Sequence, residues 1–254
     1  MPSPAGAIPA LWFDELGSTN AEARRRAEAG EAGPLWIAAR RQTAGRGRRG
    51  RAWESGQGNL AATLLMTTTR AAAEAAQLSF VAALAVRELA VRHVPDAVVR
   101  LKWPNDVLIK GAKAAGILIE SGRREDGDLW LAIGIGVNLA SAPEGLDYPA
   151  TSLAEHLGPD APHAPAPDEA LGVLSGAFGR WLQVWERDGF EPLRAEWTRH
   201  ALGLGGRCTA RLGDRSVEGV ALEMDCGGAL VLRLDSGELQ RITAGDVFFG
   251  DTSH

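Results

Sequence analysis

The chain has 254 residues, a formal net charge of −5 and a pI near 5.6. With 45% hydrophobic and 23% charged residues, it has the composition of an ordinary globular protein with room for one large domain, or a large and a small one. The acidic balance argues against bulk nucleic-acid binding, which usually needs a basic face. Residues 1–9 lack the pattern of a signal peptide, and no apolar run is long enough to span a bilayer. We therefore expect no membrane association.

The two cysteines, Cys208 and Cys226, form no cluster with metal-ligand spacing. Such sparse cysteine usage fits a reducing compartment and predicts a cytoplasmic protein. Small thiols of this kind are more often packed in the interior than reactive, so we expect no redox role.

The first part of the chain alternates apolar strands with amphipathic helices. Helices are expected at residues 21–29 and 73–93. Strands are expected at residues 35–40, 59–68, 98–103, 107–110, 115–121 and 129–138. Thr19 and Glu22 have the spacing of a capping box, and Gly30 fits the helix C-terminus. Residues 111–113, which include Lys113, are expected to form a hairpin turn.

Three more helices are expected before the composition changes near residue 202, at 151–157, 168–188 and 192–200. Glycine-rich turns then separate five short strands, expected at residues 207–212, 216–223, 229–234, 239–243 and 247–249. This pattern is typical of a small β-barrel or meander. We therefore divide the chain into a domain of residues 1–200 and a small domain of residues 201–254.

A glycine- and arginine-rich stretch spans residues 42–51, where Arg46, Arg48, Arg49 and Arg51 alternate with glycines. Glycine allows close backbone approach, and the guanidinium fork suits carboxylate and phosphate oxygens. With almost no apolar side chain to bury, the stretch is predicted to be a mobile loop that closes over an anionic ligand. It lacks the ending of a Walker A loop, and taken alone it could also be an RNA-binding segment.

Gly134 and Gly136 leave one face of the strand at residues 129–138 without side chains. The sequence leaves two interpretations open. The bare face is either a tight contact between sheet and helix or a floor for a flat ligand.

Five motifs together are more specific than any one of them. In chain order they are Ser-Thr-Asn at 18–20, Gln-Thr-Ala-Gly-Arg-Gly-Arg-Arg-Gly-Arg at 42–51, Lys-Trp-Pro-Asn-Asp at 102–106, Lys-Ala-Ala-Gly-Ile-Leu-Ile-Glu at 113–120 and Gly-Ile-Gly-Val-Asn at 134–138. In this order and spacing, the chain resembles the biotin protein ligases, also called biotin–[acetyl-CoA-carboxylase] ligases, over residues 14–140.

The resemblance implies an α+β fold, in which a mixed β-sheet flanked by helices, as in class II aminoacyl-tRNA synthetases and biotin ligases, precedes a small SH3-like β-barrel. It implies that biotin is activated with ATP and Mg²⁺ to biotinyl-5′-AMP and then transferred to a lysine of a biotin carboxyl carrier domain of a biotin-dependent carboxylase. It also allows a homodimer formed through a sheet edge. Only about thirteen residues precede the first predicted helix region, so we expect no N-terminal DNA-binding domain and no DNA partner.

The resemblance also assigns residues to roles. Lys113 and Arg48 are the implied catalytic residues. The implied biotin contacts are Ser18, Thr19, Asn20, Gln42, Gly45, Arg46, Gly47, Arg48, Lys113 and Gly116. The implied ATP and adenylate contacts are Arg46, Arg48, Trp53, Lys102, Lys113 and Asn138. Asp106 would position the acceptor lysine, and no fixed metal site is implied.

Arg49 and Arg51 are expected to pair with a carboxylate and so order the closed loop, and Trp103 with Pro104 to form a structural corner. Two other functions stay open from the sequence: a lipoate-type ligase of the same superfamily, and a non-catalytic biotin-binding or sensor module. The presence of both Lys113 and Arg48 favours an enzyme.

Overall fold

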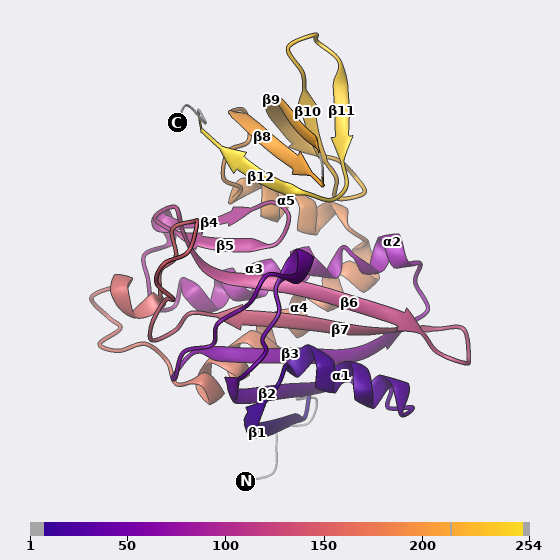
Figure 1. Ribbon diagram of the computed structural model, residues 1–254, viewed down its shortest axis with the longest axis vertical. Coiled ribbons are helices and arrows are strands. Elements are labelled where there is room, and N and C mark those ends of the chain that lie inside the picture. The colour runs from indigo at the N-terminus through magenta and orange to yellow at the C-terminus, as the bar shows by residue number, and fades with distance from the viewer. Residues whose placement is uncertain (1–7, 214, 251–254) are drawn as a thin grey trace.

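The computed structural model describes residues 8–213 and 215–250 and contains a large mixed sheet and a small antiparallel sheet (Figure 1). The large sheet has seven strands in the order β1-β2-β3-β7-β6-β5-β4. Its strands are β1 (Ala10–Leu16), β2 (Leu35–Gln42), β3 (Leu60–Thr68), β4 (Val99–Lys102), β5 (Asp106–Ile109), β6 (Ala112–Arg123) and β7 (Leu129–Val137). β1 runs parallel to β2, and the other neighbours pair antiparallel. The predicted mixed sheet is confirmed.

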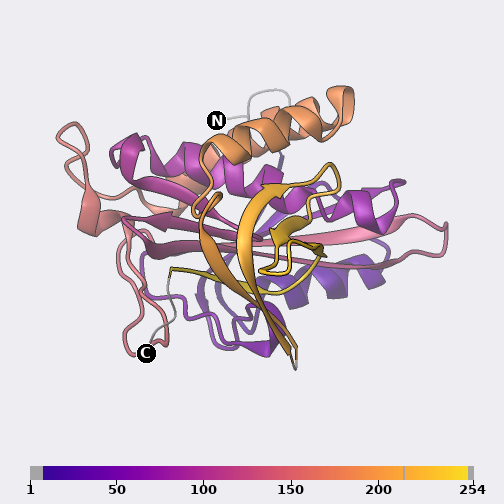
Figure 2. The ribbon, with the colours of Figure 1, turned by 90° about the horizontal axis from the view of Figure 1, so that it is seen from above.

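Helices cover both faces of this sheet (Figure 2). On one face, α1 (Thr19–Glu28) contacts β2, β3 and β7. On the other, α3 (Leu78–Ala90) and α4 (Pro167–Asp188) pack together over the sheet, and α5 (Glu191–Arg199) contacts both. Because side chains alternate along a strand, Trp36 faces the core beneath α4 while Ile37 faces α1. Within the described residues, no helix combines the length and apolar character needed to cross a bilayer.

Near the start of the chain, the sequence analysis missed one strand, and its prediction of a capping box at Thr19 and Glu22 is wrong. The chain before α1 forms β1, a partly exposed edge strand whose burial does not alternate, so it carries no period-2 signal. Ser18, not Thr19, is the N-cap of α1, because the Thr19 side chain turns to Gln42 instead of capping. Glu22 accordingly pairs with the arginines of its own helix.

The helix expected at residues 73–93 is divided into α2 (Ala72–Ala75) and α3. At the break, the side-chain oxygen of Gln77 accepts a hydrogen bond from the Trp185 indole at 2.9 Å, which ties this point to α4. The short helix expected at 151–157 is a 3₁₀ turn, η3 (Leu153–His156). Two further 3₁₀ turns are η1 (Arg48–Gly50) and η2 (Asp96–Val98).

The turn between β5 and β6 also lies earlier than expected. Lys110 and Gly111 form it with φ of 50° and 84°, so Lys113 is the second residue of β6 and not a turn residue. A strand holds the base of its side chain more firmly than a solvated turn would, which matters for the site described below.

The C-terminal sheet has five antiparallel strands in the order β11-β10-β9-β8-β12. Its strands are β8 (Arg207–Leu212), β9 (Arg215–Met224), β10 (Leu230–Arg233), β11 (Leu239–Ile242) and β12 (Asp246–Phe249). All five expected strands are present. Of the small β-barrel or meander that the sequence predicts, the structure shows an open SH3-like sheet, because in the described residues the two edge strands β11 and β12 do not pair with each other.

The C-terminal sheet packs on the β4 end of the large sheet (Figure 1). The Trp103 indole is 2% exposed and donates to the carbonyl oxygen of Gly228 at 3.0 Å. Phe80 of α3 packs against Phe190 and Trp197, with ring centroids 5.2 and 5.6 Å apart. This shared core fixes β12 beside the ends of β4 and β5, where a cavity opens.

Candidate active site

A cavity of about 360 Å³ lies between the large sheet and β12, within the usual range for ligand pockets. The structure brings nearly all of the predicted site residues to it. Those that line it are Ser18, Thr19, Asn20, Gln42, Arg46, Gly47, Arg48, Trp53, Lys102, Asp106, Lys113 and Gly116. Gly134 and Gly136 of the fifth motif line it as well, so residues from all five sequence motifs meet in one space.

One end of the cavity is a buried polar pocket at the N-terminus of α1. The Thr19 backbone N–H and hydroxyl donate to Oε1 of Gln42 at 2.8 and 3.1 Å. The Asn20 side chain donates to Oε2 of Glu120 at 2.8 Å. The Thr63 hydroxyl lies 2.8 Å from the Thr19 hydroxyl and 2.7 Å from Oδ1 of Asn20. These bonds fix the orientation of each amide and hydroxyl, as selective binding of a polar heterocycle requires.

The two glycines of β7 make room for protein side chains. A Cβ on Gly134 would lie 2.2 Å from Oδ1 of Asn20, so the sheet–helix contact is the interpretation that holds there. A Cβ on Gly136 would lie 2.3 Å from Cε2 of Trp53. The flat group that lies over Gly136 is therefore the indole of Trp53. This indole also lies next to Gly116.

The glycine–arginine loop folds back on itself beside this pocket. Trp53 N–H donates to the Gly45 carbonyl at 2.9 Å, and Gly47 N–H donates to the Arg51 carbonyl at 2.7 Å. A Cβ on Gly45 would lie 2.3 Å from the Trp53 carbonyl oxygen, so this close approach requires glycine. Gly45 is not among the residues that line the cavity, and its contact with biotin stays a prediction.

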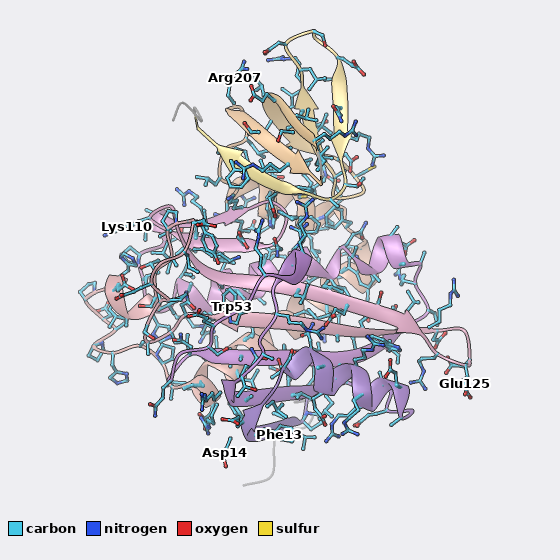
Figure 3. All side chains as sticks on the ribbon, viewed as in Figure 1. Phe13, Asp14, Trp53, Lys110, Glu125 and Arg207 are labelled. Atoms are coloured by element: carbon cyan, nitrogen blue, oxygen red, sulfur yellow. The ribbon has the colours of Figure 1, made fainter. Side chains whose placement is uncertain are left out.

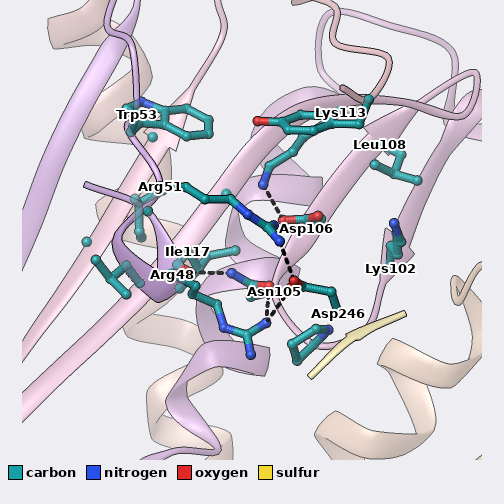
Figure 4. Close-up of a pocket in the computed structure, with 18 of the residues that line it drawn as sticks. Arg48, Arg51, Trp53, Lys102, Asn105, Asp106, Leu108, Lys113, Ile117 and Asp246 are labelled. Atoms are coloured by element: carbon teal, nitrogen blue, oxygen red, sulfur yellow. Dashed lines mark hydrogen bonds and ion pairs between the residues drawn. The ribbon is translucent and has the colours of Figure 1, made fainter. Parts of the chain in front are cut away.

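The loop arginines face the C-terminal sheet. Arg49 and Arg51 pair with Asp246 at 3.4 and 2.5 Å, which confirms the expectation that they meet a carboxylate. Arg48 donates to Oδ1 of Asn105 at 3.2 Å (Figure 4). It also donates to the carbonyl oxygen of Gly245 at 3.1 Å. Burial lowers the pKa of the Arg48 guanidinium, although its neighbour Asp246 opposes that effect. Arg48 keeps its charge at neutral pH all the same.

Lys113 reaches the centre of the cavity from β6. Its Nζ lies 2.6 Å from Oδ1 of Asp106, which follows the predicted corner on β5 (Figure 4). The same ammonium lies 5.6 Å from the ring centroid of Trp53 and 5.5 Å from that of Tyr148, within cation–π range of both. A carboxylate and two aromatic rings thus hold one positive charge in place.

Lys102 supplies a second cation from the end of β4. Its Nζ lies 5.4 Å from the ring of Phe248 on β12. Burial lowers the pKa of the Lys102 ammonium, while Asp106 works in the opposite direction. An ammonium that is short of solvent gains from an anionic ligand, because the ligand replaces the lost hydration.

Asn138 lies outside this cavity and lines a neighbouring one of about 270 Å³. Trp53 and Lys113 border both cavities. The Asn138 side-chain N–H donates to the Thr151 carbonyl at 3.0 Å, while its buried Oδ1 has no hydrogen-bond partner within the described part of the chain. A buried acceptor of this kind is expected to find a donor, and a ligand in the second cavity could provide one.

Sequence reasoning missed four functional neighbours of these residues: Asp246, Phe248, Tyr148 and Thr63. The first three come from segments outside the motifs, and only the tertiary fold brings them near. Thr63 carries a weak signal, because it is the one hydroxyl within the apolar run at residues 60–66 of β3. Glu120 could have been found, since it ends the fourth motif and pairs with Arg46 at 3.8 Å.

A resident metal site is not built into the residues that the structure describes, which contain no group of three or more metal-ligand side chains. Asp106 and Asp246 line the cavity but face lysine and arginine. Oxygen ligands for Mg²⁺ would therefore come from nucleotide phosphates, as is usual for this ion.

Comparison with known proteins agrees with this geometry. Residues 16–138 match the model of the Biotin/lipoate A/B protein ligase family, and residues 203–250 match that of the Biotin protein ligase C terminal domain. The chain is 45% identical over 235 residues to the biotin–[acetyl-CoA-carboxylase] ligase of Paracoccus denitrificans, covering 92% of this chain and 97% of that protein.

Two solved structures extend the likeness to the fold. The Aquifex aeolicus biotin protein ligase in complex with biotin and ATP is 26% identical, with a TM-score of 0.78 over 95% of this chain and 98% of that one. The Leishmania major biotin protein ligase in complex with biotinyl-5-AMP is also 26% identical, with a TM-score of 0.64 over 93% and 99%. The chain belongs to the biotin protein ligase family.

Proposed function

We propose that the chain acts as a biotin–[acetyl-CoA-carboxylase] ligase, which activates biotin with ATP and transfers it to a lysine of a biotin carboxyl carrier domain. The observation that carries this function is the single cavity shared by the polar pocket at α1, the Lys113 ammonium and the loop arginines. A carboxylate is a poor acyl donor, so it must first be joined to a good leaving group. Two anions have to meet for this to happen, and fixed cations make their approach favourable.

In the proposed binding mode, biotin lies with its ureido ring and sulphur toward Ser18, Thr19, Asn20 and Gln42. The polar network around these residues supports this orientation. Arg46, Gly47 and Gly116 would border the rest of the ligand. Its carboxylate would then point toward Lys113 and Arg48.

ATP would place its adenine in the second cavity, against the indole of Trp53 and with its amino group toward the unpartnered Oδ1 of Asn138. The phosphates would extend toward Lys102, Arg46 and Arg48. A biotin carboxylate oxygen attacks the α-phosphorus, the bond to the bridging oxygen breaks, and pyrophosphate leaves. Lys113 lies where negative charge accumulates in that step. Mg²⁺ bound by the phosphates would supply charge neutralisation for the triphosphate and the departing pyrophosphate.

In the second step, the neutral amine of the acceptor lysine attacks the anhydride carbonyl of biotinyl-5′-AMP. An amide bond forms, the bond to the phosphate oxygen breaks, and AMP leaves while the amine loses a proton. We propose that Asp106 orients the incoming amine, because its carboxylate lies beside Lys113 at the cavity.

The function is tested by incubating the chain with biotin, ATP, Mg²⁺ and a carrier domain, and measuring the mass of the carrier. Attachment of one biotin to one lysine is the expected result. Lipoate in place of biotin is the matched comparison, and preferential transfer of lipoate would contradict the proposed substrate.

We also propose a division into a biotin- and ATP-binding domain, residues 1–200, and a C-terminal domain, residues 201–254. A homodimer through the outer edge of β1 is supported by its position at the end of the sheet, and sedimentation velocity would test it. The two free cysteines support a cytoplasmic setting. The net charge of −5 supports a protein without a DNA partner, which a gel-shift assay at moderate salt would test.

A further inference from the structure

A network of hydrogen bonds connects Glu120 of β6 to the polar end of the larger cavity. Oε2 of Glu120 accepts from Nδ2 of Asn20 at 2.8 Å. Oδ1 of Asn20 lies 2.7 Å from the Thr63 hydroxyl, which in turn lies 2.8 Å from the Thr19 hydroxyl. Thr19 and Asn20 line the cavity, whereas Glu120 is not among the described residues that line it. Glu120 therefore acts on a ligand through its neighbours.

The sheet holds Glu120 on the face that α1 covers. Glu120 lies opposite Ala132 of β7 in the antiparallel register, and Ala132 packs in one buried cluster with Ala23 of α1. Asn20, near the start of the same helix, is 4% exposed and occupies the space that a side chain at Gly134 would need. The carboxylate and the amide thus meet between a helix and a sheet that are packed together.

The acceptors around Asn20 decide which way its amide points. An ionised carboxylate can only accept hydrogen bonds, and Nδ2 of Asn20 also lies 3.4 Å from the carbonyl oxygen of Leu118. Turning the amide over would place Oδ1 against the oxygens of both Glu120 and Leu118, with no hydrogen between them. The neighbouring groups therefore require the observed orientation.

The fixed amide sets the direction of two hydroxyl groups. Oδ1 of Asn20 carries no hydrogen, so the buried Thr63 hydroxyl pairs with it by donating its single hydrogen. Toward the Thr19 hydroxyl, Thr63 is then an acceptor. The Thr19 hydrogen points either to Thr63 or to Oε1 of Gln42 at 3.1 Å. In both cases a protein oxygen takes that hydrogen, and the Thr19 oxygen keeps lone pairs for a donor in the cavity.

We propose that Glu120 is a positioning residue of the biotin pocket, which holds the Asn20 amide in one orientation and so fixes the polarity of the hydroxyl groups beside the ligand. The effect on biotin depends on the proposed function, whereas the coupling between Glu120 and Asn20 does not. A pocket with its polarity already fixed binds more tightly, because fewer arrangements are lost on binding. The competing explanation for Glu120 is charge pairing with Arg46, whose guanidinium lies 3.8 Å away.

Isothermal titration calorimetry of the whole chain with biotin separates these two roles. Glu120→Leu removes both the acceptor and the charge, and we expect the Kd for biotin to rise about tenfold or more, the scale of one hydrogen bond to a charged group. Glu120→Gln keeps an acceptor oxygen without the charge and should recover most of that affinity. If Glu120→Gln bound biotin as weakly as Glu120→Leu, pairing with Arg46 would replace the proposal. An unchanged Kd in Glu120→Leu would overturn it as well.

An exchange of the two side-chain types tests the contact itself. Asn20→Asp alone brings two carboxylates together and should weaken biotin binding, since like charges repel. Asn20→Asp combined with Glu120→Gln again pairs one carboxylate with one amide, with the hydrogen bond reversed, and position 20 still offers an oxygen to Thr63. The double variant should therefore bind biotin more tightly than Asn20→Asp alone. Absence of any recovery would contradict the proposal.

Glu125→Leu is the matched control. Glu125 is exposed in the turn that joins β6 to β7, far from Trp53 (Figure 3), and its replacement should leave biotin binding unchanged. The KM for ATP provides a second comparison in the Glu120 variants. A positioning role predicts a weaker affinity for biotin with little change in this KM. A general loss of structure would impair both, and that result would count against the proposal.

Chemical denaturation without any ligand gives a measurement that does not depend on biotin. The fall in the unfolding midpoint caused by Asn20→Asp should become smaller when Glu120→Gln is added, because the two positions are in contact. Strictly additive effects would show that Glu120 does not hold Asn20. If the unmodified chain bound no biotin, the proposed function would fail, and denaturation would still decide whether the two residues are coupled.

Discussion

Nζ of Lys113 lies 2.6 Å from Oδ1 of Asp106, across the neighbouring strands β6 and β5. This pair places a lysine and an acid in the larger cavity, and Lys113 also borders the neighbouring cavity that Asn138 lines. The aromatic rings of Trp53 and Tyr148 flank the ammonium at 5.6 and 5.5 Å, which limits its movement. The lysine is therefore held in position by the protein and not by its ligand.

Lys113→Ala is expected to slow the formation of biotinyl-5′-AMP by about a hundredfold or more, the scale of losing one electrostatic stabiliser of a transition state. Single-turnover release of pyrophosphate measures this step. Lys110→Gln, at an exposed lysine in the adjacent turn, is the control and should retain full activity. An unchanged rate in Lys113→Ala would remove this lysine from the mechanism.

Asp106→Asn distinguishes the two proposed steps. If Asp106 orients the acceptor amine, transfer from preformed adenylate to the carrier should fall about tenfold or more, in the range of a lost acid–base or orienting contact. Adenylate formation should change much less. Equal loss in both steps would indicate that Asp106 acts only by holding Lys113.

ATP binding should weaken as the pH rises, because Lys102 loses its positive charge. Burial lowers the pKa of this lysine, so its ammonium loses the proton at a lower pH than an ordinary lysine does. The neutral amine no longer attracts phosphate, and the KM for ATP should rise as the pH passes that pKa. Lys102→Arg keeps its charge throughout and should remove this part of the pH dependence. Identical profiles for both proteins would contradict the assignment.

Gly134→Ala should destabilise the fold, because the new Cβ would lie 2.2 Å from Oδ1 of Asn20, which is 4% exposed. We expect a loss of about 1–3 kcal/mol in the free energy of unfolding, the usual cost of overpacking a core. Chemical denaturation measures it. Gly136→Ala on the same strand meets Trp53 of a loop that can shift, so it should lose less stability. A larger loss in Gly136→Ala would contradict this account of the two glycines.

Much of the site could be predicted because its residues lie in short motifs at the ends of periodic strands. The motif around Lys113 predicted a strand that carries a cation. Only the start of that strand was wrong, because Lys113 was expected in the turn and lies in β6. β1 gave no signal because its exposure does not alternate, and its place is decided by parallel pairing with β2. Asp246 is an ordinary acid at the start of an ordinary short strand. Its importance comes from packing between two sheets, which no local pattern encodes.

The central claim is that one cavity joins the carboxylate of biotin to the α-phosphate of ATP. The most direct measurement uses ATP labelled at the α-phosphorus, with Mg²⁺ and biotin but no carrier domain. The label should appear in enzyme-bound biotinyl-5′-AMP, with one pyrophosphate released per adenylate formed, and adding the carrier should convert it to AMP. Pyrophosphate release that is independent of biotin, or the absence of any labelled adenylate, would contradict the account.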